Sequence, residues 1–99
     1  MIQRIIETVA EEFKVNPIDI VWRDGKTGRD ISAARYVCAF MLKGKMPMDQ
    51  IAALLGRRNG QYGYSAVKRV EERSATDHEF YMRVLKLADL LGVRPFVTS

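Results

Sequence analysis

Apolar residues in this chain recur mostly three and four positions apart, which is the spacing of one face of an α-helix. Residues 2–13 show this most clearly, because one face carries only apolar side chains: Ile2, Ile5, Ile6, Val9, Ala10 and Phe13. The pattern predicts an amphipathic first helix. It should end before Asn16, because Pro17 pushes the residue that precedes it out of the helical region.

The segment that follows predicts a short helical turn and then a basic loop. Asn16 is a good N-cap and Pro17 suits the first helical position, so residues 17–22 are expected to form one turn. Residues 23–30 (Arg-Asp-Gly-Lys-Thr-Gly-Arg-Asp) contain two glycines and three cations. This composition predicts a loop.

A nearly all-apolar helix is predicted next. Ile31 or Ser32 would open it, with Ser32 the better cap if it starts late. It runs to Lys43 and should stop at Gly44 and Pro47. A helix that is apolar around most of its girth is usually central to the core.

Three more helices are predicted in the second half of the chain. The first spans Met48 to Leu55, with Gly56 as its left-handed terminator, and the second runs from about Asn59 to Ser74. The last runs from Asp77 to Leu91 and ends at Gly92, with Phe80, Val84, Leu87, Ala88 and Leu91 on one stripe. The chain shows no strand pattern, so we expect an all-α, compact bundle of five to six helices.

Composition narrows the class of protein. The 99 residues suit one domain, expected over residues 1–92 with a tail at 93–99, and 47% hydrophobic with 28% charged residues is typical of a folded protein. The net charge of +4 favours a polyanionic partner. The single Cys38 is expected to be a buried hydrophobe in a reducing compartment. Since no membrane span or signal peptide is recognisable, we expect a cytoplasmic protein, nucleoid-associated if it binds DNA.

Several segments together suggest a family. They are Val9-Ala-Glu-Glu-Phe13, the basic loop, Ala34-Arg-Tyr-Val-Cys-Ala-Phe-Met-Leu42, Ile51-Ala-Ala-Leu-Leu-Gly56, Arg58, and Ala66-Val-Lys-Arg-Val-Glu-Glu-Arg73. In this order they resemble the C-terminal DNA-binding domain (domain IV) of the bacterial replication initiator DnaA, over about residues 2–91. The resemblance implies a Trp-repressor-like helix-turn-helix whose second helix enters the major groove. The ATPase domain of the initiator has no counterpart here, so duplex binding is implied and initiator activity is not.

The chain departs from that family where the second helix begins. The family signature reads Gly-Gly-Arg-Asp-His-Ser/Thr-Thr-Val, whereas residues 56–63 here read Gly-Arg-Arg-Asn-Gly-Gln-Tyr-Gly. Arg58 carries over and Asn59 is close to the aspartate. The histidine and hydroxyl residues that read bases in the family are replaced, and the anchoring valine is Gly63. We therefore expect the fold and docking mode to be kept, and recognition of the family's own DNA box to be lost.

The expected DNA contacts begin in the turn. Arg57 and Arg58 can meet phosphates or a guanine edge, or can form a solvated turn. Asn59 can cap the second helix or read a base, and capping is favoured. Gln61 can pair with adenine, or can be a plain exposed residue.

Aromatic residues and glycines alternate at the start of this helix. Tyr62 and Tyr64 can offer hydroxyl groups to phosphates or rings to thymine methyls, and we expect Tyr64 to turn inward to fill the space beside Gly63. Gly60 and Gly63 each cost about 1 kcal/mol of helix stability relative to alanine. That cost suggests either close approach of the backbone to DNA or a helix start that becomes ordered on binding.

The remaining candidates lie farther along this helix and in the basic loop. Ser65, Lys68 and Arg69 should face outward, whereas Val67 and Val70 should face inward and Arg73 should pair locally. Loop residues Arg23, Lys26 and Arg29 correspond to the family's minor-groove loop, although an ordinary surface loop is the alternative. Arg35 matches a family arginine near the DNA backbone, or it supports the fold by pairing with a carboxylate.

Catalysis is not expected, because one cysteine and one histidine far apart in sequence build no convincing site, and no cofactor or metal motif appears. The alternative to DNA binding is a protein-interaction adaptor or homodimer. Tyr81, Met82, Leu85 and Leu90 add apolar surface to the last helix, and Val93-Arg-Pro-Phe-Val97 adds more. We therefore favour a stand-alone transcription or replication regulator, bacterial or from a phage, that binds double-stranded DNA.

Overall fold

The computed structural model describes residues 2–21, 28–57 and 60–96, and within these ranges it has six α-helices and no β-strand. The helices are α1 (Ile2–Phe13), α2 (Pro17–Val21), α3 (Arg29–Leu42), α4 (Met48–Leu54), α5 (Gln61–Thr76) and α6 (His78–Leu91). The predicted all-α bundle is confirmed. No described helix combines the length and the apolar character that crossing a membrane requires.

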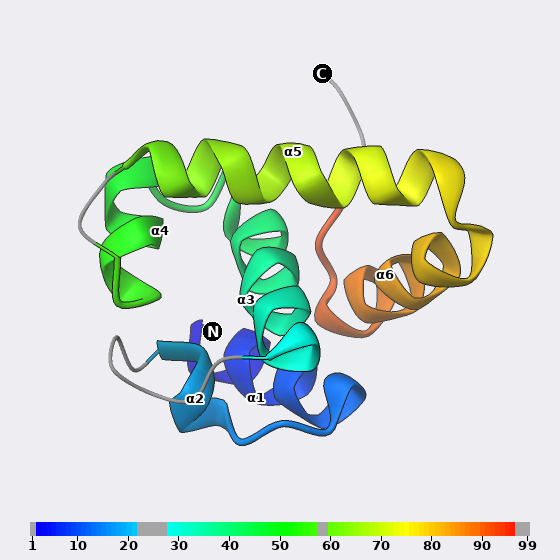
Figure 1. Cartoon of the computed structure of the whole chain (residues 1–99), viewed down its shortest axis with the longest axis horizontal. Helices are drawn as coiled ribbons and strands as arrows, with labels where there is room; N and C mark the ends of the chain where they lie inside the picture. The colour runs from blue at the N-terminus through cyan, green and yellow to red at the C-terminus, as the bar shows by residue number, and fades with distance from the viewer. Residues whose placement is uncertain (1, 22–27, 58–59, 97–99) are drawn as a thin grey trace.

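The central helix is α3, as its apolar sequence predicted. Nine of its 14 residues are buried, and its most extensive contacts are with α5 and α1. Figure 1 shows α5 lying across one side of the molecule, with α4 near its first turns and α6 beneath its last turns. The stripe predicted for α6, from Phe80 to Leu91, is buried in full. The inner side of α5 packs on this core, and its opposite side is exposed.

The end of α1 and the beginning of α2 lie where the sequence pattern predicts them. Lys14 adopts a left-handed conformation (φ 56°), and the N–H of Val15 donates to the carbonyl of Ala10 at 3.0 Å, which closes α1. The side-chain oxygen Oδ1 of Asn16 accepts from the N–H of Ile18 at 3.1 Å. Asn16 therefore caps α2, with Pro17 as its first residue.

The predicted start of α3, at Ile31 or Ser32, is two or three residues too late. The helix begins at Arg29, so Arg29 and Asp30 belong to its first turn and not to the loop. Ser32 does not cap the helix, because its N–H already donates to the carbonyl of Gly28 at 2.9 Å. An acidic residue in the first turn is favoured by the helix dipole, and Asp30 occupies that position.

Arg35 is the one buried charged residue among those described, with 2% of its surface exposed. Its Nε donates to the carbonyl of Ile20 at 3.1 Å and its Nη2 to the carbonyl of Asp19 at 2.7 Å. Carbonyls near a helix C-terminus lack partners within their own helix. Arg35 thus ties the end of α2 to α3, and this gives it a structural role.

Residues 93–96, which follow α6, pack against the rest of the protein. Val93 and Pro95 are buried, and the ring of Phe96 lies 4.9 Å from that of Phe40 and 5.1 Å from that of Tyr81. The expectation that this segment adds exposed apolar surface is wrong for residues 93–96. The reason is that α3 and α6 leave an apolar site into which Phe96 fits.

Candidate nucleic-acid interface

A glycine terminator joins α4 to the turn before α5. Gly56 is left-handed (φ 74°), as predicted. The N–H of Gly56 donates to the carbonyl of Ala53 at 3.1 Å and that of Arg57 to the carbonyl of Ala52 at 2.8 Å. This pair of bonds is the Schellman motif, which fixes the direction in which the chain leaves a helix.

The start of α5 lies slightly later than expected, at Gln61. Gly60 precedes it and forms no side-chain cap bond. Arg58 and Asn59 lie outside the described residues, as do Arg23 and Lys26 of the basic loop. Capping by Asn59 and DNA contact by these cations therefore stay predictions.

Gly63 is buried against α4. A Cβ atom added to Gly63 would lie 3.1 Å from both the carbonyl oxygen and the Sδ of Met48. Gly60 is less restricted, because the nearest atoms to its added Cβ are those of Asp49 at 3.5 Å. The close approach at Gly63 is thus between α4 and α5, a contact that neither of the two predicted explanations for this glycine included.

The two tyrosines beside Gly63 are arranged opposite to the prediction. Tyr64 has 60% of its surface exposed, whereas Tyr62 is half-buried and packs against the core. The side chain of Met48 already occupies the space beside Gly63, so no ring is needed there. Tyr62 instead faces α3, with its ring 6.1 Å from that of Tyr36.

Arg57 is partly buried beside Tyr62. Its guanidinium carbon lies 5.3 Å from the centre of the Tyr62 ring, and its Nε is buried without a hydrogen-bond partner among the described residues. Burial raises the pKa of the Tyr62 hydroxyl, and the positive charge of Arg57 acts in the opposite direction. This arrangement fixes the turn to the first residues of α5.

The outer face of α5 carries the polar residues predicted for it. Gln61, Ser65, Lys68 and Arg69 are exposed, whereas Val67 and Val70 are buried, so the predicted inward and outward positions are confirmed. The segment from residue 57 to residue 70 contains no aspartate or glutamate. It is therefore a cationic stretch without internal neutralisation.

The last turns of α5 differ from this stretch. Glu71 lies 3.8 Å from Nζ of Lys43, and Arg73 lies 3.6 Å from the carboxylate of Asp77. The guanidinium of Arg73 also lies over the Phe80 ring, 4.1 Å from its centre. The prediction that Arg73 pairs locally is confirmed.

Tyr36 is the residue that the sequence did not single out. It lies between two candidate residues, because the guanidinium of Arg69 is 5.5 Å from its ring and Tyr62 packs on its other side. Arg29, Ser32 and Tyr36 follow one another at helical spacing on α3. A predicted helix that began at Arg29 would have shown this spacing as a polar ridge on an otherwise apolar helix.

Cys38 is fully buried, and burial raises the pKa of its thiol far above the usual range, which suppresses the reactive thiolate. Within the described ranges, no three His, Cys, Asp or Glu side chains come together in a way that could hold a metal ion. No protein-family model matches the sequence.

Proposed function

We propose that this protein binds double-stranded DNA, with α5 in the major groove. The observation that carries the proposal is the exposed outer face of α5, which is cationic, free of carboxylates up to residue 70, and firmly seated on α3 and α4. A helix that presents such a face can enter a groove lined by phosphates. The resemblance to the DNA-binding domain of DnaA supports the same docking mode.

The exposed residues on the outer face of α5 each have a role in this proposal. Lys68 and Arg69 contact phosphates, and Ser65 donates to a phosphate or to a base edge. Gln61 reads a base through its amide, a contact worth about 1–3 kcal/mol of discrimination. Tyr64, exposed on the same helix, offers its ring or hydroxyl group. Arg57 and Tyr62 position the turn, so their contribution is indirect.

Further proposed contacts come from residues outside the described ranges. Arg58 and Asn59 directly follow Arg57 in the sequence, and Arg23 and Lys26 precede the first residue of α3 by a few positions. Arg29, which begins α3, is exposed. In the proposal Arg58 meets a phosphate or a guanine edge, Asn59 caps the helix or reads a base, and Arg23 and Lys26 contact the backbone or the minor groove. The protein would act as a stand-alone regulator of transcription or replication.

The adaptor alternative has less surface than the sequence suggested. Tyr81 and Leu85 are partly buried, and Phe96 covers Tyr81. Met82 and Leu90 stay exposed, at 50% and 56%. Single exposed apolar residues are normal on soluble proteins. DNA binding is therefore the better-supported function.

Fluorescence anisotropy with labelled duplexes over a salt series tests the proposal. Duplexes would first be selected from a random pool. The logarithm of the binding constant should then fall linearly with the logarithm of the salt concentration, with a slope of about −0.9 per phosphate contact. Lys68→Ala should weaken binding to all duplexes alike and reduce the slope by about 1. Gln61→Ala should instead relax preference at one base pair. Lys86→Ala, which removes an exposed cation from α6, is the matched control.

One result of the binding assay would contradict the proposal. Binding that is absent at low salt for every selected duplex would overturn the proposal. A stable homodimer or protein complex whose formation depends on Met82 and Leu90 would then favour the adaptor.

A further inference from the structure

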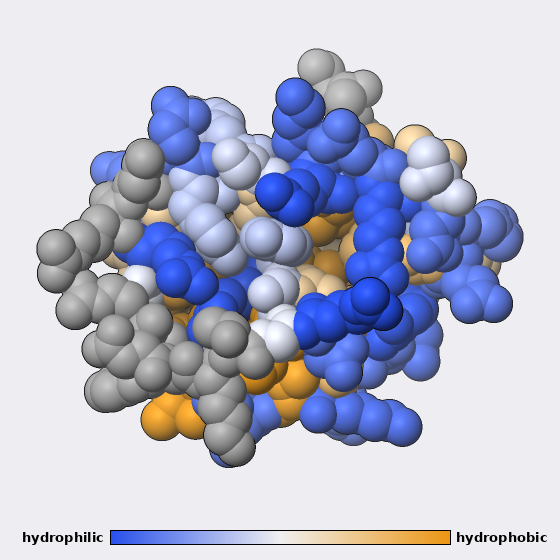
Figure 2. Space-filling model, in the orientation of Figure 1, coloured by the Kyte–Doolittle hydropathy of each residue, from blue (hydrophilic) through white to orange (hydrophobic). Residues whose placement is uncertain are grey.

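A hollow lies between α3 and α5, next to the start of α6. Its volume is about 770 Å³, which is within the range of small-molecule sites. Its lining residues are Arg29, Ser32, Ala33, Tyr36, Arg69, Val70, Glu72, Arg73, Thr76 and Phe80. Figure 2 shows this face with strongly hydrophilic side chains around a paler, partly hydrophobic depression. We call it the α3–α5 groove.

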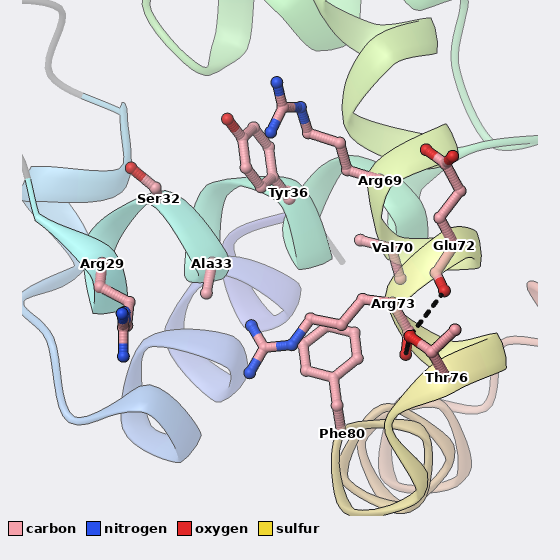
Figure 3. Close-up of a pocket in the computed structure, with 10 residues that line it drawn as sticks. All are labelled: Arg29, Ser32, Ala33, Tyr36, Arg69, Val70, Glu72, Arg73, Thr76 and Phe80. Atoms are coloured by element: carbon pink, nitrogen blue, oxygen red, sulfur yellow. Dashed lines mark hydrogen bonds between the residues drawn. The ribbon is translucent and has the colours of Figure 1, made fainter.

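Three arginines reach this groove from two helices. Figure 3 shows Arg73 extending from α5 across the ring of Phe80 toward α3, where Arg29 lies on the other side of Ala33. Arg69 lies beside Tyr36, while the carboxylate of Glu72 points away from Arg29 and Arg73. The lining thus carries three positive charges and one negative charge, and the negative charge is turned outward.

Two of the three arginines lie over aromatic rings. Arg69 lies over Tyr36 and Arg73 over Phe80, at 5.5 and 4.1 Å from the ring centres. Within the described part of the chain, Arg29 and Arg69 form no ion pair. Arg73 pairs with Asp77, but both of these side chains are exposed to solvent. Exposed pairs of this kind contribute only about 0–1 kcal/mol. A guanidinium stacked on a ring keeps its N–H edge free for an anion.

We propose that the α3–α5 groove binds the sugar-phosphate unit of a nucleotide. The phosphate would be held by Arg29 and Arg73, since guanidinium groups match the geometry of phosphate oxygens. The sugar would rest against the half-buried ring of Tyr36, because Val70 and Phe80 beneath the groove are almost fully buried, and a bare inorganic anion would not make this contact.

Two sources can supply this chemistry. One is the backbone of a duplex that lies along α5, and this source rests on the proposed function. The other is a free mononucleotide, which would bind whether or not the protein binds DNA. The groove contains Arg29 and Arg73, which lie off the outer face formed by Gln61, Ser65 and Lys68, so the two sites can be altered separately.

The test uses two groove variants and a charge-matched control. Arg29→Gln combined with Arg73→Gln removes both cations. Ser32→Asp places a negative charge in the groove at the first turn of α3, where the helix dipole tolerates an acidic residue. Lys86→Gln combined with Arg94→Gln removes the same charge from residues that do not line the groove. Thermal unfolding would verify that every variant is folded.

Two measurements distinguish the sources. In the first, the salt slope of duplex binding should fall by about 0.9 per lost contact in the double groove variant, and hardly at all in the control. In the second, deoxyadenosine 5′-monophosphate should shift the backbone amide signals of residues 32, 36, 69 and 73 in an NMR titration. Deoxyadenosine and inorganic phosphate should each shift them less.

The results separate this inference from the proposed function. A changed slope supports the backbone as the source, whereas mononucleotide shifts that both groove variants abolish support a free nucleotide. If the wild-type protein binds duplex with a slope that the groove variants leave unchanged, and the mononucleotide shifts nothing, the groove inference is overturned while DNA binding stands. If the wild-type protein binds no duplex, the nucleotide titration alone decides the groove.

Discussion

The two ends of α5 are attached to the protein in different ways. At its first turn, Gly63 lets Met48 of α4 approach within van der Waals contact, and Tyr62 turns toward α3. In its middle and later turns, Ala66, Val67 and Val70 fill the space above α3 with their own side chains. The packing of the first turn depends on the absence of a side chain at Gly63, whereas the packing of the later turns depends on apolar side chains that fill the space.

The charges at the two ends differ as well. Lys68 and Arg69 have no carboxylate partner among the described residues, whereas Glu71 and Arg73 are paired with Lys43 and Asp77. A single helix therefore has one part whose described cations are unpaired and another part whose charged residues form exposed ion pairs. The first two-thirds of α5 are where DNA contact through the outer face is expected, and its last turns contribute only Arg73, through the α3–α5 groove.

Shortening a side chain in the later half should have the largest effect. Val70 is 1% exposed and packs in the core, so Val70→Ala should lower the free energy of unfolding by about 2–3 kcal/mol through lost burial and a cavity. Urea unfolding monitored by circular dichroism measures this. Ala75→Gly on the exposed side of α5 is the control, and should cost only about 1 kcal/mol of helix propensity. Equal losses in the two variants would contradict the packing described for Val70.

Lengthening a side chain at the first turn should be the next largest effect. Gly63→Ala should lower the free energy of unfolding by about 1 kcal/mol, because the clash with Met48 outweighs the gain in helix propensity. Gly60→Ala is the matched control, since its Cβ meets only ordinary contacts and its φ of −59° suits alanine. It should leave stability unchanged or raise it by a few tenths of a kcal/mol. If Gly63→Ala is as stable as Gly60→Ala, the α4–α5 contact is looser than described.

Removing the acidic limit of the proposed DNA face should have a smaller effect. Glu72→Gln takes away an exposed negative charge one turn beyond Lys68, and should raise duplex affinity by about two- to fivefold at low salt. Because no phosphate contact is added, the salt slope should change little. Glu79→Gln on α6 serves as the control in the same anisotropy assay. Equal gains from both changes would mean that only net charge matters and that the end of α5 is not a limit.

The smallest effect concerns Tyr62 at high pH. Burial raises the pKa of Tyr62 in the folded protein above its value of 10.0 in the unfolded chain. The resulting stability is complete below pH 10 and is lost as the pH rises through the folded pKa. Stability should therefore fall less steeply above pH 10 in Tyr62→Phe than in the wild type.

Arg57→Gln provides the opposite change at the same site. Removing a positive charge that lowers the Tyr62 pKa should raise that pKa further, and stability should then fall more steeply above pH 10. Urea unfolding at pH 9, 10 and 11 measures both variants. Parallel curves for all three proteins would place the Tyr62 hydroxyl in solvent.

Periodicity predicted most of the fold, because helices reveal themselves through the spacing of apolar residues. The stripe on α6 and the left-handed Gly56 were both predicted from sequence. The start of α3 was missed because Gly28 and the charged residues after it are also typical of a loop. Fold and caps depend on local chemistry, which a sequence displays directly.

The candidate site was less predictable because it depends on contacts between helices. The inward turn of Tyr62 in place of Tyr64 follows from the position of Met48, which belongs to another helix. The packing of Phe96 on Phe40 and Tyr81 likewise joins segments far apart in the chain. The outward positions of Ser65, Lys68 and Arg69 were predictable because they depend only on the phase of α5.

The most direct test of the proposed DNA face is a residue-by-residue map. Backbone amide signals would be followed by NMR as a selected duplex is added to the labelled protein. The largest shifts should fall at Gln61, Tyr64, Ser65, Lys68 and Arg69, with the exposed residues of α6 unaffected. Shifts confined to Met82 and Leu90, or no shifts at a saturating duplex concentration, would contradict the assignment of α5 to DNA.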